Sequence, residues 1–217
     1  MKTCLVVYVF TIICQLGLFS QNVPNGGFEE WELNTYQAYE PAGWETQNET
    51  GLYYVEKAAG HSGSYSAKLS IVWDNVIKSF TGASLSTEEN FQVTSRYQTL
   101  SGFYKGNSND TDTLKITVRM YSKDKPVGFG SCFIANANKE WKRFILQIEY
   151  NSDEIPDKAS ISIFIATEGD NHYQTVYFID DLLLTSIIKS VYGDVGNFAL
   201  RTDNQTEYKN KIQILIT

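Results

Sequence analysis

Cysteine, histidine and long apolar runs are scarce in this chain. It has three cysteines and two histidines among 217 residues. Cys4 and Cys14 lie close to the N-terminus, so a chain that loses this segment keeps only Cys132 and forms no internal disulfide. We expect Cys132 to be an isolated buried thiol. Stability must then come from a hydrophobic core, and the chain is long enough to build one domain around it.

The N-terminal residues match the pattern of a signal peptide. Lys2 precedes the apolar stretch Leu5–Ile13, and more polar sequence follows. This stretch is shorter than the roughly 20 apolar residues that a helix needs to span a bilayer, and no later segment is longer. We predict a signal peptide at residues 1–21, cleaved near Ser20 or Gln21. The protein is therefore expected to be exported to the periplasm, the cell surface or the medium.

Basic residues are in the minority. The chain has 18 Lys and Arg against 25 Asp and Glu, which gives a formal net charge of −7. Nucleic-acid binding relies on clustered Lys and Arg that neutralise phosphates. The sequence has no such cluster, so we exclude nucleic acid as a partner.

Helical periodicity is also missing after the signal. Several segments instead alternate apolar and polar residues with a period of two, which is typical of strands. In residues 66–73, for example, Ala67, Leu69 and Ile71 share one face. We expect further strands at residues 97–105, 114–121, 127–134, 143–150, 160–166 and 176–184.

Turns rich in Gly, Asn, Asp and Ser separate these segments. Eight or more short strands, each with one buried face, predict an all-β protein, a two-sheet antiparallel jelly-roll sandwich. We place this domain at residues 22–186 and interpret residues 187–217 as a C-terminal tail or an extra strand.

Short motifs follow one another along the chain. They are Val23-Pro-Asn-Gly-Gly-Phe-Glu-Glu-Trp31 with Pro41-Ala-Gly-Trp44, Gly60-His-Ser-Gly-Ser-Tyr-Ser-Ala-Lys-Leu69, Leu100-Ser-Gly-Phe-Tyr-Lys105, the Trp141 strand, Ile155-Pro-Asp-Lys-Ala-Ser-Ile-Ser-Ile163 and Phe178-Ile-Asp-Asp-Leu-Leu-Leu184. In these motifs and their order the chain resembles secreted Bacteroidetes proteins, in particular the PCMD type of carbohydrate metabolism domain and, more widely, the galactose-binding-like and carbohydrate-binding jelly rolls. The resemblance covers about residues 23–185, and it implies the fold more than an activity.

The resemblance also implies a structural calcium ion. Related modules hold one between the N-terminal segment and a late strand, which would make Glu29 and one of Asp180 or Asp181 its ligands. Ca²⁺ takes six to eight oxygen ligands, so carboxylates and backbone carbonyls suit it. In the other interpretation, these three residues are solvated edge carboxylates or turn caps.

Sugar recognition needs aromatic faces for the apolar side of the ring and polar groups for the hydroxyls. Parity along residues 114–121 puts Arg119 and Tyr121 on the face opposite the apolar one. The candidate ligand-binding residues are Tyr104, Arg119, Tyr121, Tyr173 and Tyr177.

The tryptophans are expected to be mainly structural. Trp73 shares parity with Leu69 and Ile71, which favours a place in the core. Trp31 and Trp44 are interpreted as core plugs at one end of the sandwich.

Catalytic motifs are weak. His61 lies in an expected turn, and Gly60-His-Ser-Gly63 lacks the spacing of a nucleophile elbow. Gly128-Phe-Gly130 lacks the third glycine of a phosphate loop, because Phe133 stands in its place. Adjacent carboxylates such as Asp180-Asp181 are expected to point to opposite faces of a strand.

These observations predict an exported, non-catalytic module that binds a carbohydrate or cell-surface glycan. Two alternatives stay open: a structural or adhesive envelope protein with no sugar ligand, and a glycan-cleaving enzyme.

Overall fold

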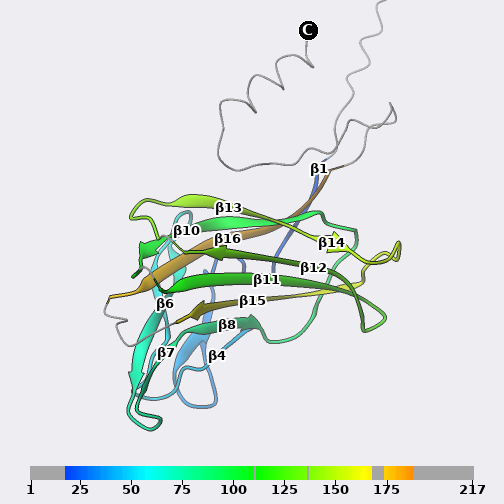
Figure 1. Cartoon of the computed structure of the whole chain (residues 1–217). Coiled ribbons are helices and arrows are strands. Elements are labelled where there is room, and N and C mark those ends of the chain that lie inside the picture. Colours follow the sequence, from blue (N-terminus) through cyan, green and yellow to red (C-terminus); the bar gives the residue numbers. More distant parts are fainter. Residues whose placement is uncertain (1–17, 110, 136, 168–173, 188–217) are drawn as a thin grey trace, which may run out of the picture.

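Two seven-stranded antiparallel sheets lie face to face in the computed structural model, which describes residues 18–109, 111–135, 137–167 and 174–187 (Figure 1). The first sheet contains β1 (Leu18–Asn22), β5 (Val55–Ala59), β6 (Tyr65–Asp74), β7 (Ser79–Gly82), β10 (Thr99–Asn107), β13 (Lys142–Gln147) and β16 (Val176–Ile187). The second contains β4 (Trp44–Thr46), β8 (Ser84–Thr87), β9 (Phe91–Gln92), β11 (Thr113–Ser122), β12 (Lys125–Ile134), β14 (Glu149–Tyr150) and β15 (Lys158–Ala166). A separate hairpin joins β2 (Trp31–Leu33) and β3 (Tyr39–Pro41).

The strand orders are those of a sandwich rather than of a simple meander. The first sheet runs β13-β10-β16-β6-β5, with β1 beside β16 and β7 beside β6. The second runs β14-β12-β11-β15-β8-β4, with β9 beside β15. The predicted all-β, two-sheet antiparallel sandwich is confirmed.

Alternating side chains build the core between the two sheets. On β11, Leu114, Ile116, Val118 and Met120 are all fully buried, because every second residue of a strand points to the same face. The facing strands contribute in the same way, which gives one continuous cluster rather than two.

The expected strand at residues 143–150 is divided between the sheets. Its first part is β13 in the first sheet, and its end is β14 in the second. Phe144, Leu146 and Ile148 nevertheless all face the core, as their alternation predicted. The chain therefore crosses from one layer to the other without losing its buried face.

The three tryptophan predictions have different outcomes. Trp31 is only partly buried and packs against the core cluster from outside it. Trp44 is 1% exposed, its ring tilted against Phe28 with the centroids 5.3 Å apart, so it plugs the core as expected. Trp73 is 43% exposed, and its predicted place in the core is wrong. The reason is that β6 runs past the end of the sandwich into a hairpin with β7 (Figure 1). In this hairpin Trp73 meets Phe80 edge-on, with the ring centroids 5.1 Å apart.

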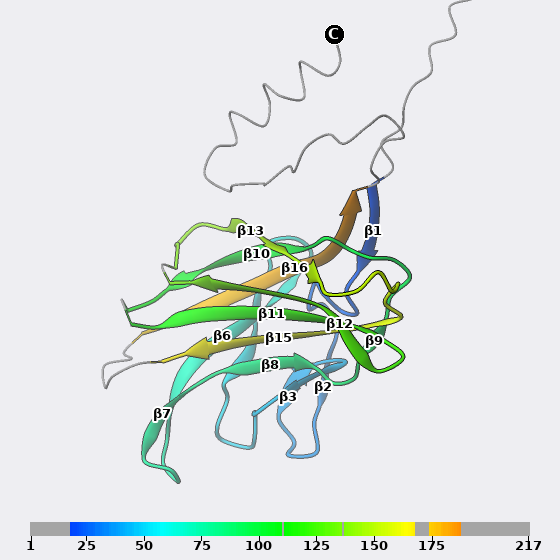
Figure 2. The same ribbon diagram turned by 45° about the vertical axis from the view of Figure 1, so that its right-hand side comes forward.

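The two ends of the described chain lie together. Strand β1 pairs with the last residues of β16 (Figure 2). Ser20 and Gln21, where cleavage is predicted, belong to β1. The signal peptide and the domain limits stay predictions, and residues 188–217 lie outside the described part. Within that part, no helix has the length and apolar character needed to cross a membrane.

Candidate functional site

The outer face of the second sheet carries two of the predicted ligand-binding residues. Arg119 is exposed and Tyr121 is half-buried, both on the side of β11 that faces away from the core. The Tyr121 hydroxyl lies 3.5 Å from Oγ of Ser160 on β15. Their predicted common face is therefore confirmed by the burial of the opposite side of the strand.

Strand β12 adds two exposed aromatic residues that the sequence analysis missed. Phe129 and Phe133 point outward and are 45% and 62% exposed. The alternate inward positions include Gly128 and Gly130, where no side chain fits. A Cβ at Gly128 would lie 2.8 Å from the Tyr150 ring, and one at Gly130 would meet the backbone that precedes β14 even more closely.

This arrangement reverses the usual distribution of residues on a half-buried strand. Burial of apolar surface normally places large side chains inside and small or polar ones outside. On β12 the aromatic rings are in water and the glycines are in the interior. Packing of the core alone does not explain outward phenylalanines, so this face is a candidate for a binding surface.

The register of the strands sorts the outer face into rows. One row holds Phe133, Lys115 and Phe164, and another holds Phe129, Arg119 and Ser160. Between them lies a row of small hydroxyl residues that crosses four strands: Ser131, Thr117, Ser162 and Ser86. Large aromatic and cationic side chains thus flank a line of hydroxyl groups.

Both cations of β11 lie over aromatic rings. Lys115 Nζ is 5.0 Å from the centroid of Phe133 and 5.5 Å from that of Phe164. The guanidinium carbon of Arg119 is 5.7 Å from the centroid of Phe129. Such contacts hold a cation in a defined place at the surface.

The other predicted ligand-binding residues do not join this face. Tyr177 has no exposed surface, so its predicted role in surface stacking is wrong. Its hydroxyl donates to the carbonyl oxygen of Ile134 at 2.9 Å and lies 3.3 Å from that of Asp112. Tyr104 belongs to the first sheet, is half-buried and packs against the core. Tyr173 lies outside the described residues.

Burial also affects the acidity of these two phenols. Desolvation raises the pKa of Tyr104 and of Tyr177, since the charged phenolate loses its hydration inside the protein. Both therefore act as neutral groups at physiological pH.

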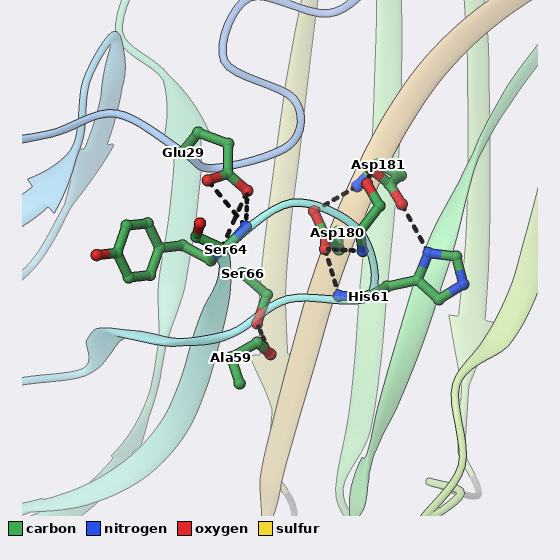
Figure 3. Close-up of polar contacts among 9 residues, drawn as sticks. Glu29, Ala59, His61, Ser64, Ser66, Asp180 and Asp181 are labelled. Atoms are coloured by element: carbon green, nitrogen blue, oxygen red, sulfur yellow. Dashed lines mark hydrogen bonds and ion pairs between the residues drawn. The ribbon is translucent and has the colours of Figure 1, made fainter.

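A second cluster forms where the predicted metal ligands meet the turn between β5 and β6 (Figure 3). Glu29 accepts hydrogen bonds from the backbone N–H groups of Ser64 and Tyr65, at 2.9 and 3.0 Å. Asp180 Oδ2 accepts from the backbone N–H of His61 at 2.6 Å and, more weakly, from that of Ser62 at 3.3 Å.

Asp181 reaches the same turn with its side chain. Its Oδ2 lies 2.7 Å from Nδ1 of His61, and its Oδ1 accepts from the Ser62 hydroxyl at 2.7 Å. The expectation that Asp180 and Asp181 point to opposite faces is wrong. The strand is irregular here, with φ of 53° at Asp181 and a register shift against β10, and this turns the second carboxylate toward the first.

Asp180 is fully buried beneath this turn. Burial raises the pKa of its carboxyl, because the charged form loses hydration, although three backbone N–H groups oppose the effect. The imidazole of His61 stacks on Phe103 with 3.7 Å between ring centroids. The cluster therefore ties the N-terminal segment, the β5–β6 turn and β16 into one polar clamp.

A calcium ion at the polar clamp would be bound by both carboxylate and carbonyl oxygens. Glu29 and Asp181 both line a depression of about 560 Å³ together with Val23, Asn25 and two glycines, Gly26 and Gly27. Among the residues that the structure describes, no three acidic, histidine or cysteine side chains are grouped around one metal position. Calcium bound here would use these two carboxylates, with carbonyl oxygens and water supplying its other ligands.

Comparison with known proteins places the fold. No protein-family model and no curated protein matches the chain. Among solved structures, the module TmCBM61, in complex with β-1,4-galactotriose, is similar over 77% of this chain and 99% of its own, with 15% identity and a TM-score of 0.50.

Two enzymes also show the similarity. An arabinose-bound α-L-arabinofuranosidase matches 79% of this chain and 27% of its own, at 17% identity and a TM-score of 0.47. A cyclase from Fischerella sp. TAU matches 80% of this chain and all of its own, at 13% identity and a TM-score of 0.47. At these identities the comparisons concern the fold alone.

The described chain therefore has the β-sandwich fold of carbohydrate-binding modules. Its closer resemblance to PCMD-type domains stays a prediction.

Proposed function

We propose that the protein is an exported, non-catalytic glycan-binding module whose ligand lies on the outer face of the second sheet. The fold is that of carbohydrate-binding modules. A polysaccharide strand or branch that runs along β11 would contact both aromatic rows. Export is included because of the N-terminal signal pattern.

The outward pair Phe129 and Phe133 carries this proposal. Sugar rings have apolar C–H faces that pack on aromatic rings, and burying such surface is favourable by about 25 cal/mol per Å². In the adjacent row Ser131 is exposed, and its hydroxyl can both donate and accept hydrogen bonds, which suits the hydroxyls of a sugar. Thr117 is buried and donates to the Ser162 carbonyl oxygen at 3.2 Å, and the Ser162 and Ser86 hydroxyls lie 2.8 Å apart. Aromatic rings beside the exposed Ser131 hydroxyl are thus complementary to a glycan chain.

The distribution of carboxylates on this face supports binding rather than cleavage. Glycosidases use two carboxyl groups that flank the scissile bond. Strands β11, β12 and β15 contain no acidic residue. Glu149 on β14 borders Phe129 and Glu45 on β4 borders Ser86, so the strand carboxylates of this face lie at opposite edges of the sheet. Two such distant groups cannot act on one glycosidic bond.

We also propose that calcium stabilises the polar clamp by binding near Glu29 and Asp181. In this role the ion would hold the N-terminal segment against β16 and would take no part in ligand contact. Support comes from the shared depression and from the preference of Ca²⁺ for carboxylate and carbonyl oxygens.

Affinity electrophoresis and calorimetry with purified polysaccharides test the binding proposal. The panel includes β-1,4-galactan, since TmCBM61 was solved with β-1,4-galactotriose, together with xylan, arabinan, cellulose and acidic polysaccharides. At least one polysaccharide should bind the full chain, and F129A/F133A should weaken that binding by at least about tenfold.

A matched control shows whether the loss of binding is specific to this face or follows from the removal of any exposed apolar side chains. Val76 and Ile77, at the tip of the β6–β7 hairpin, are 85% and 59% exposed. V76A/I77A should leave binding unchanged. Equal losses in both double variants, or no binding to any polysaccharide, would overturn the proposed face.

A further inference from the structure

The candidate binding face is positively charged in a protein that is acidic overall. Strands β11, β12 and β15 carry four basic residues and no acidic one, whereas the whole chain has a net charge of −7. The basic residues are Lys115, Arg119, Lys125 and Lys158. At the edges of the same face, Glu149 borders Phe129 and Glu45 borders Ser86. These two carboxylates reduce the excess of basic residues on the face but do not cancel it.

Among the described residues, three of these cations have no carboxylate partner, and two of those three lie over outward aromatic rings. Lys158 pairs with Asp124 at 2.8 Å. Within the described ranges, by contrast, Lys115 and Arg119 form no ion pair with a carboxylate. Each lies instead over the aromatic rings that would pack against a sugar. An anionic group that reached either cation would find it unpaired and held in place.

From this charge pattern we infer that the ligand is an anionic glycan, one that carries uronate carboxylates or sulfate esters. The inference rests on the proposed function and specifies its ligand class. A guanidinium binds a carboxylate or sulfate through charge-assisted hydrogen bonds that are about twice as strong as those to a neutral hydroxyl. Lys115 and Arg119 therefore favour an acidic sugar over its neutral counterpart.

The spacing of the two cations sets the minimum length of the ligand. Lys115 and Arg119 are four residues apart on one strand, which corresponds to about 13 Å at roughly 3.3 Å per residue. A single sugar ring is too short to contact both. The ligand is thus an oligosaccharide with negative charges on more than one residue, and an acidic monosaccharide should bind weakly.

The test compares glycans that differ only in charge. Oligogalacturonate is paired with its carboxyl-reduced form of the same length and linkage, and carrageenan is paired with desulfated carrageenan. Calorimetry of the full chain should give at least about fivefold tighter binding to the acidic member of at least one pair. Raising the salt from about 50 mM to about 500 mM should weaken that preference, because exposed charges are screened. The galacturonate and carrageenan arms distinguish carboxylate from sulfate as the preferred group.

Charge variants show which basic residues cause the preference for acidic glycans. K115Q/R119Q should remove the preference for the acidic member while keeping residual binding to the neutral one. K142Q/R143Q changes the net charge equally but alters exposed residues of β13 in the first sheet, and it should keep the preference. Oligogalacturonate should also bind far more tightly than galacturonic acid.

The failure of this inference differs from the failure of the proposed function. If F129A/F133A weakens binding but acidic and neutral members bind equally, the ligand class is wrong and the binding face stands. The inference is also wrong if K142Q/R143Q lowers the preference as much as K115Q/R119Q does. If no glycan binds in a manner that depends on Phe129 and Phe133, the proposed function itself is wrong.

Discussion

Arg119 and Phe129 lie directly opposite each other on neighbouring strands, with the guanidinium carbon 5.7 Å from the centre of the ring. Both side chains point into solvent, although a phenylalanine normally gains by burial. The pair is possible because Gly128 and Gly130 occupy the inward positions on either side of Phe129. The exposed face thus depends on these two glycines, because the core has no room for a larger residue at either position.

G130A should therefore destabilise the fold without any contact with ligand. The added methyl group would lie 2.9 Å from Leu146 Cδ2 and closer still to the carbonyl oxygen of Gln147. We expect a loss of about 1–3 kcal/mol, the usual effect of overpacking. Urea unfolding measures it, with S131A on the solvent side of the same strand as the control. A fully stable G130A would show that β12 does not need glycine there.

The positions of the main strands could be predicted from the sequence because their inner faces are apolar, whereas the order of the strands in each sheet was not predicted. Residues 114–121, for instance, alternate so regularly that β11 was expected within a residue of its observed ends. On β12 the same method failed to assign the faces. Gly128 and Gly130 carry no side chain, so the alternation of apolar and polar residues is interrupted there and did not show that Phe129 and Phe133 point outward.

The polar clamp shows a different limit of prediction from the sequence. The resemblance of the chain to known jelly rolls suggested that Glu29 and Asp180 approach each other. Their actual partners are backbone N–H groups of the β5–β6 turn. The rotation of Asp181 into the clamp depends on a positive φ within a strand, which alternation of residue types does not encode.

Y177F tests whether Tyr177 is structural. Its hydroxyl satisfies buried carbonyl oxygens from two distant parts of the chain, Ile134 and Asp112. Losing the hydroxyl leaves these acceptors with one partner fewer, so unfolding should become easier by about 1–2 kcal/mol. Glycan affinity should not change. A stable Y177F with weakened glycan binding would restore the surface role that the structure rejects.

Calcium should raise thermal stability if it binds at the clamp. The full chain, stripped with a chelator, is melted with and without about 1 mM CaCl₂, and we expect an upward shift of several degrees because the ion binds only the folded state. E29Q and D181N should lose this shift. D124N, which alters a surface ion pair in the β11–β12 turn, should keep it.

The same experiment has a result that would contradict calcium binding. Equal melting temperatures in chelator and in calcium would leave the clamp as a purely hydrogen-bonded structure. A calcium shift that persists in both E29Q and D181N would place the ion elsewhere.

Cys132 should be unreactive at neutral pH. It lies on the inner side of β12, and burial raises the pKa of its thiol from the ordinary value of 9.0 to about 11. At pH 8 about one thiol in a thousand is then ionised, against about one in ten for an exposed cysteine, and alkylation by iodoacetamide should be roughly 100-fold slower. Mass spectrometry of the Cys132 peptide measures this rate separately from Cys4 and Cys14.

The raised pKa of Cys132 also determines whether its contribution to the stability of the fold is gained or lost as the pH rises. The folded state holds the thiol proton more tightly than the unfolded state does, so the contribution is complete below pH 9 and is lost as the pH rises toward 11. Between pH 9 and pH 11, C132A should therefore lose less stability than the natural chain. If Cys132 instead reacts at pH 8 as fast as a free peptide thiol, then β12 opens readily, and the outward phenylalanines would not be held on a rigid face.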